Sequence, residues 1–163
     1  MTEEFVRLAD LVGVPVEQDA DASLDVAVWP VYARAVDRLA DLAPLRAALV
    51  EETDEAIVGS AVLRIIEQRA DEPADDWIAL VEPPRQDFHV RRAAEAVRLR
   101  ELVAGENATT GEAMAWSDWL QRRVIDHVPT QSVIAALAEG GRTQAVRSAA
   151  QSRLTDVELV RPA

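Results

Sequence analysis

Three segments of the chain share one pattern of apolar and polar positions. In each, a short apolar stretch ends near a leucine, a polar turn follows, and a longer periodic stretch begins with a valine nine or ten residues after that leucine. The segments are residues 45–66, 77–99 and 133–154. Because apolar residues recur at helical spacing, each segment predicts a short helix and a longer helix joined by a turn.

The longer helix of each segment has an apolar stripe that we expect to be buried. The stripes are Val58, Ala61, Val62 and Ile65 in the first segment, Val90, Ala94 and Val97 in the second, and Val146, Ala149, Ala150 and Leu154 in the third. The three turns use different chemistry. The first offers N-cap side chains at 51–54, the second has Pro83-Pro84, which cannot continue a helix, and the third has Gly140-Gly141, which suits a left-handed C-cap.

The first 43 residues predict a helical cap at one end of these helix pairs. We expect a short amphipathic helix, an acidic loop, and a second helix that starts at Pro30. The residues concerned are Phe5, Leu8, Leu11 and Val12 in the first helix, Glu17, Asp19, Asp21 and Asp25 in the loop, and Val31, Ala35, Val36 and Leu39 in the second helix. Residues 155–163 have no clear period, and we expect this tail to fray.

The second and third segments lie further apart than the first and second. Their leucines are separated by 57 residues, against 31 for the first two, which leaves residues 105–129 as an inserted helix or a decayed repeat. The spacing from Thr109 to Glu112 predicts a capping box. The helix after it carries Trp116, Trp119, Leu120 and Val124 on one side.

Composition agrees with an all-α fold. Apolar residues make up 49% of the 163 residues, mostly Ala, Val and Leu, whereas aromatic residues are only 4%. The chain has no cysteine, which excludes a disulfide framework, a thiolate zinc site and a cysteine nucleophile. With neither a signal-peptide pattern nor an apolar run of ~20 residues, we expect a cytoplasmic protein without membrane contact. All basic residues are Arg, which suggests a GC-rich coding genome and a bacterial source.

The net charge of −12 is unevenly distributed. Residues 1–82 contain 19 acidic residues and 6 Arg, whereas residues 83–163 contain 10 acidic residues and 11 Arg, so the two parts carry −13 and +1. An acidic front part repels phosphate backbones and favours a partner with a basic surface. The alternative interpretation is an ordinary solvated surface.

The longer helices resemble the second helix of the HEAT repeat. Residues 90–94 (VRRAA) and 146–150 (VRSAA) match its Val-Arg-x-x-Ala pattern, whereas the first segment has Gly59 in place of the Arg. The resemblance implies a short α-solenoid of stacked antiparallel helix pairs in a single domain, residues 1–163. It also implies that Arg91 and Arg147 tie neighbouring repeats together. The domain would consist of the cap 1–43, repeats at 44–70, 75–104 and 130–154, the region 105–129, and the tail 155–163.

Few residues in the chain suit catalysis or ligand binding. His89 and His127 lie beside apolar neighbours near predicted helix ends, where we expect structural imidazoles. The glycines form no phosphate-binding loop, and neither a zinc-binding helix nor a calcium loop is present. Carboxylate pairs such as Asp75-Asp76 are expected to cap helices. We therefore expect no catalytic residue, no metal and no cofactor.

The HEAT resemblance implies a concave face suited to a protein partner, so we predict a non-catalytic protein-binding scaffold or adaptor. Charged residues opposite the apolar stripe of 90–97 are expected to face outwards. Trp116, Asp118 and Trp119 could line a groove. The candidate partner-binding residues are Glu67, Arg92, Glu95, Arg100, Glu101, Trp116, Asp118 and Trp119.

Two other functions stay open. HEAT-like DNA glycosylases use aromatic side chains and an Asp on a concave face, and this resemblance would assign Trp116, Asp118 and Trp119 to a base-modifying site. The acidic charge argues against nucleic acid as a partner. The second alternative is an acidic regulatory or immunity-type subunit that masks a basic surface on one protein. The sequence leaves a homo-oligomer open as well.

Overall fold

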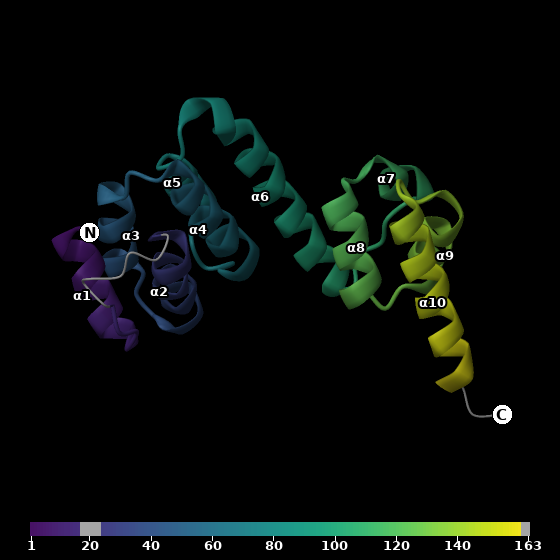
Figure 1. The fold of residues 1–163 in the computed structure, drawn as a ribbon. Helices are drawn as coiled ribbons and strands as arrows, with labels where there is room; N and C mark the ends of the chain where they lie inside the picture. The colour runs from purple at the N-terminus through teal and green to yellow at the C-terminus, as the bar shows by residue number, and fades with distance from the viewer. Residues whose placement is uncertain (17–23, 161–163) are drawn as a thin grey trace. The chain divides into compact units, whose positions relative to one another are not determined.

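The computed structural model describes residues 1–16 and 24–160, and every regular element in this part of the chain is an α-helix (Figure 1). The all-α prediction is confirmed. The helices are α1 Glu3–Val12, α2 Leu24–Arg38, α3 Ala43–Glu51, α4 Glu55–Gln68, α5 Ala74–Ile78, α6 Pro83–Val103, α7 Thr110–Ala115, α8 Asp118–His127, α9 Gln131–Gly140 and α10 Gln144–Val160.

Contacts divide the chain into two compact units, Met1–Ala93 and Ala94–Ala163. We call them unit 1 and unit 2 and describe each by itself. The single domain expected from the sequence stays a prediction. Among the described residues, no helix combines the length and the apolar character needed to cross a bilayer.

Helix pairs in unit 1 pack in two rows. α1 packs against α3, and α2 packs against α4. The first row continues to α5, because Arg46 of α3 donates to the Asp76 carbonyl at 2.9 Å and its guanidinium lies over the Trp77 ring. The second row continues to the first half of α6, where the His89 ring lies against Gly59 of α4. α5 also packs against α4.

The core of unit 1 lies between these rows, and the stripe predicted for α4 is confirmed. Val58, Ala61, Val62 and Ile65 are all buried. In α1 the prediction is wrong at Leu11, which is exposed while Ala9 is buried.

The expected start of α2 at Pro30 is also wrong. The helix begins at Leu24 and contains Pro30 in its interior. Val28 and Val31 are both buried, so the apolar face of α2 continues across the proline. Most of the predicted acidic loop lies outside the described residues.

In unit 2, α9 packs most extensively against α10, and further helix pairs are in contact. α7 packs against α9, and α8 packs against α10. Val146 and Ala150 of the predicted stripe are buried and Leu154 is partly buried, whereas Ala149 is exposed. The core residues of this unit include Leu102, Leu120, Val124, Ile134 and Leu137.

Residues 105–129 contain two helices, α7 and α8, in place of a single inserted helix. The two helices are separated at Trp116 and Ser117, because the Ser117 side chain caps the start of α8. The capping box between Thr109 and Glu112 is confirmed. Residues 155–160 continue α10 as a helix, and residues 161–163 of the predicted tail lie outside the described residues.

The predicted left-handed cap at Gly140-Gly141 is wrong, since Gly141 has φ −55° and ψ 146°. A close approach explains this glycine instead. A Cβ at Gly141 would lie 2.6 Å from both the Leu137 carbonyl oxygen and Val146 Cγ1. The turn after α9 therefore leaves no room for a side chain at this position.

Helix α6 differs most from its prediction. Val90 is 52% exposed and Val97 is 47% exposed, and Ala94 is exposed too, whereas His89 and Ala96 are buried. The expected apolar stripe is therefore wrong. The face of α6 that packs on α4 carries the polar side chains of His89 and Arg92, and an apolar pattern does not reveal such a face.

Candidate protein-interaction site

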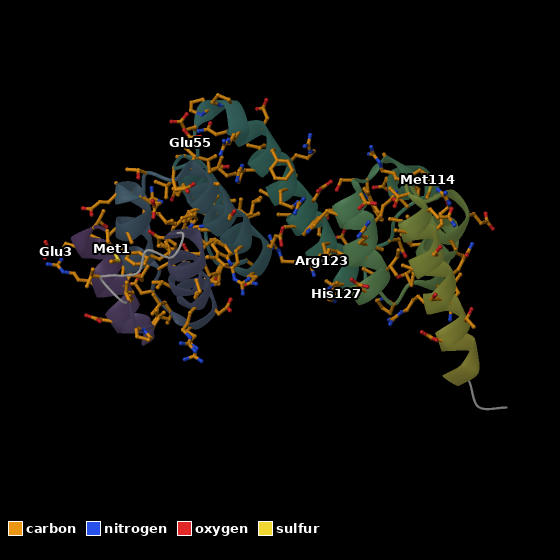
Figure 2. The ribbon with its side chains drawn as sticks, viewed as in Figure 1. Met1, Glu3, Glu55, Met114, Arg123 and His127 are labelled. Atoms are coloured by element: carbon orange, nitrogen blue, oxygen red, sulfur yellow. The ribbon has the colours of Figure 1, made fainter. Side chains whose placement is uncertain are left out.

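The turn between α3 and α4 is acidic and lies between two hollows in unit 1. The first hollow has a volume of about 780 Å³ and the second about 480 Å³. Both are lined by Glu52, Thr53, Glu55 and Arg85, so they adjoin along this turn. We call the two hollows together the acidic groove. Glu55 projects from the start of α4 (Figure 2).

Glu52 gives the turn its shape. Its Oε1 accepts the backbone N–H groups of Thr53 at 2.9 Å and Asp54 at 3.0 Å, and its Oε2 accepts the Tyr32 hydroxyl at 3.0 Å. Tyr32 is buried, and its ring meets Phe5 edge to face. Burial, together with the negative Glu52, raises the pKa of Tyr32 above its usual range, so the phenol stays neutral and keeps donating.

The neighbouring acidic residues of the turn have further roles. Asp54 is the N-cap of α4 and accepts the N–H groups of Ala56 and Ile57. Glu55 pairs with Arg85 at 3.3 Å. Glu51 and Glu82 are exposed, and no ion pair or side-chain hydrogen bond engages either carboxylate within the described part of the chain. The acidic groove thus carries five carboxylates and one guanidinium.

Apolar side chains form the floor of the acidic groove. Phe5, Val28 and Ile57 line the first hollow. The second hollow is lined by Leu49, Val50, Val58, Leu80 and Val81. Val50 is 64% exposed, so part of the floor of the second hollow is open to solvent. An apolar floor beside an acidic wall suits a ligand that is both apolar and cationic.

Two of the predicted binding residues belong to unit 1 and form an ion pair. Arg92 Nη1 lies 2.6 Å from Glu67 Oε1, and their side chains are 13% and 22% exposed. The Arg92 guanidinium also lies over the Phe88 ring at 5.3 Å. Arg92 therefore turns towards α4, and the expectation that it faces outwards is wrong.

Three predicted charged residues belong to α6 in unit 2. The Glu95 carboxylate accepts the Ser117 backbone N–H at 3.3 Å. Glu101 pairs with Arg98 at 3.1 Å. Arg98 also pairs with Glu106 and Glu112. Arg100 is half-buried, as are Glu95 and Glu101. These side chains support α6 and the start of α8, and their contact with a partner stays a prediction.

Trp116, Asp118 and Trp119 lie at the break between α7 and α8. Asp118 accepts the Thr143 hydroxyl at 2.9 Å and pairs with Arg122 at 2.8 Å. Both tryptophans are partly buried against the core of unit 2. The three residues thus join α8 to the start of α10 and to the core.

His89 is structural, as predicted. It is buried, and its Nδ1 lies 3.0 Å from the Arg85 carbonyl oxygen while its Nε2 lies 3.1 Å from the Gly59 carbonyl oxygen. His127 is exposed at the end of α8. Within residues 1–16 and 24–160, His, Asp and Glu side chains nowhere gather in a group of three that could hold a metal ion.

The acidic groove was missed in the sequence because its parts come from four places in the chain. The acidic residues 51–55 were assigned to capping, which Asp54 confirms. The acidic residues themselves were the only part of the acidic groove that the sequence made visible. Comparison with protein-family models, curated proteins and solved structures gives no match.

Proposed function

We propose that the chain is a non-catalytic scaffold or adaptor that binds a partner protein, and that it is built as a short HEAT-like α-solenoid. The row packing supports this architecture. In unit 1 the rows are α1, α3 and α5 beside α2, α4 and the first half of α6; in unit 2 they are α7 and α9 beside α8 and α10. On this proposal residues 105–129 are a decayed repeat.

The observation that carries the binding proposal is the acidic groove with its apolar floor. Unit 1 contains 20 acidic residues and 9 Arg, a net charge of −11, whereas unit 2 has a net charge of −1. Such a field favours association with a basic protein surface and slows association with anionic partners. An acidic regulatory subunit that masks one basic surface is a specific form of the same proposal.

The contacts of Asp118 favour a scaffold over a base-modifying enzyme. The Asp118 side chain is 39% exposed, and both of its oxygens already have partners in the fold, the Thr143 hydroxyl at 2.9 Å and Arg122 at 2.8 Å. A chain with −12 net charge also gains little from counterion release on a phosphate backbone. Both observations point away from nucleic acid as the partner.

Affinity capture tests this proposal. The tagged chain is incubated with lysate of its source organism at low salt and at ~0.5 M salt, and the retained protein and nucleic acid are both quantified. We expect one protein in stoichiometric amount at low salt, with less retained at high salt. Retention of nucleic acid without a protein partner would contradict the proposal and favour the base-modifying alternative.

A further inference from the structure

We propose that the acidic groove binds an extended basic segment of a partner protein, with an apolar side chain in a hollow and Arg or Lys side chains opposite the carboxylates. This inference rests on the proposed function and names the chemistry of the partner. The observations behind it are the continuity of the two hollows, the charge of their walls and the apolar character of their floor.

Continuity favours an extended ligand. Three residues at the acidic turn, together with Arg85 of α6, line both hollows, so a chain that crosses the turn reaches the hollow on either side. Volumes of about 780 and 480 Å³ exceed what a single side chain fills. A segment of several residues therefore fits the acidic groove better than one projecting side chain.

The negative charge of the acidic groove favours a positively charged ligand. Five carboxylates and one guanidinium line the acidic groove, and that guanidinium already pairs with Glu55. Glu51 and Glu82 are exposed, with carboxylates that hold no part of the fold in the described residues. Both are therefore able to accept hydrogen bonds from Arg or Lys without disturbing the turn.

The apolar floor of the acidic groove favours a ligand that also has apolar groups. Val50 is 64% exposed beside Leu80 and Val81, and Phe5 and Ile57 line the other hollow. Arg and Lys cover such surfaces with their methylene stems while the charged group stays near carboxylates. A leucine or similar residue between two basic residues would add buried apolar area.

Fluorescence anisotropy with defined peptides tests the inference. The probe is a labelled ten-residue peptide of alternating Arg and Leu. One comparison peptide has Glu in place of Arg, and another has Ser in place of Leu. The test variant is Glu51→Gln/Glu55→Gln/Glu82→Gln. The control variant removes the same number of charges from exposed positions of unit 1 outside the acidic groove, Asp10→Asn/Asp75→Asn/Asp76→Asn.

We expect the Arg-Leu peptide to bind wild type and the control variant with similar Kd values, and the test variant at least ~10-fold more weakly, since three of the facing charges are removed. The Glu peptide should not bind, and the Ser peptide should bind several-fold more weakly. Raising salt from ~20 to ~200 mM should weaken binding to wild type.

Equal binding to both variants, or no binding to wild type at low salt, would overturn the inference. Different results would contradict the proposed function and the inference about the acidic groove. If the test variant still captures the same partner protein from lysate, the scaffold proposal stands and the acidic groove is not its binding site. If no protein is captured while the Arg-Leu peptide binds as expected, the groove is confirmed as a basic-peptide site and the scaffold proposal fails.

Discussion

His89 Nε2 of α6 lies 3.1 Å from the carbonyl oxygen of Gly59 in α4. The contact joins the two helices at a position where glycine leaves room for the imidazole ring. This contact explains why position 59 has glycine and not a residue with a long side chain. A long side chain at position 59 would occupy the space of the imidazole ring. Buried polar groups of this kind are stabilised by their partners, and here the partners are backbone carbonyls.

The effect of a substitution at Gly59 on stability should depend strongly on the size of the new side chain. An added Cβ would lie 3.6 Å from His89 Nε2, an ordinary contact, so Gly59→Ala should stabilise the protein by about 0.5 to 1 kcal/mol through higher helix propensity. Gly59→Leu should destabilise it by about 1 to 3 kcal/mol through overpacking. Urea unfolding followed by circular dichroism measures both. Similar destabilisation by the two variants would contradict the contact.

Tyr32 should not ionise in the folded protein near pH 10. Burial and the negative Glu52 raise its pKa above the usual range, so its contribution to stability is complete below pH ~10 and is lost as the pH rises further. Tyr32 is the chain's single tyrosine, so the rise in absorbance at 295 nm on phenol ionisation reports on it alone, above a constant background from the four Trp.

We expect no tyrosinate signal from folded protein up to pH ~11, and a transition near pH 10 in urea. Tyr32→Phe is the control, and it should remove the signal in both states. A native transition with its midpoint near pH 10 would show that the phenol is not held by Glu52 in solution.

Gly140 and Gly141 should differ in their tolerance of alanine. At Gly141 the new Cβ would meet the Leu137 backbone oxygen at 2.6 Å, and neither group is able to move away easily. We expect Gly141→Ala to lower the free energy of unfolding by about 1 to 3 kcal/mol.

Gly140→Ala is the matched variant. Its Cβ would meet only Met114, at 2.6 Å from the sulfur of a flexible side chain. We expect a loss below about 1 kcal/mol, because Met114 can change rotamer. Thermal unfolding of the two variants side by side tests the difference, and equal losses would argue against the tight turn after α9.

Glu112 should contribute to acid sensitivity. The Thr109 backbone N–H, the Thr109 hydroxyl and the nearby Arg98 lower the pKa of Glu112. A lowered pKa stabilises the folded state above the unfolded value of ~4.3, and this contribution is lost as the pH falls through the folded value. Glu112→Gln keeps an acceptor oxygen for the capping box but does not titrate.

The Tm of wild type and Glu112→Gln should therefore be compared between pH 3 and 6.5. We expect wild type to be the more stable at pH 6.5 and the two proteins to converge below pH 4. A constant difference across this range would mean that Glu112 ionisation is not linked to folding.

The sequence predicted helices well where apolar residues alone fill the interface. The apolar stripe of α4 was found in this way. The capping box at Thr109 was found from the spacing of two polar residues, which is also a local signal. The orientation of α6 was not predicted. Its buried face carries His89 and Arg92, which are polar but have partners on α4, so the exposed valines gave the stronger apolar pattern.

The acidic groove could not be predicted from spacing, since it depends on tertiary packing. Met1, Val28, Ile57 and Arg85 meet there only after the two rows of helices have formed. Charge was the part of the site visible in the sequence. The excess of acidic residues before residue 83 indicated a basic partner, and the structure places five of these carboxylates around one groove.

The most direct test of the central claim, that the chain works by binding a protein, is quantitative capture of the same partner by wild type and by the two charge variants. We expect wild type and Asp10→Asn/Asp75→Asn/Asp76→Asn to retain one protein at low salt, and Glu51→Gln/Glu55→Gln/Glu82→Gln to retain little of it. Capture of nucleic acid alone, or of no macromolecule, by wild type would contradict the claim.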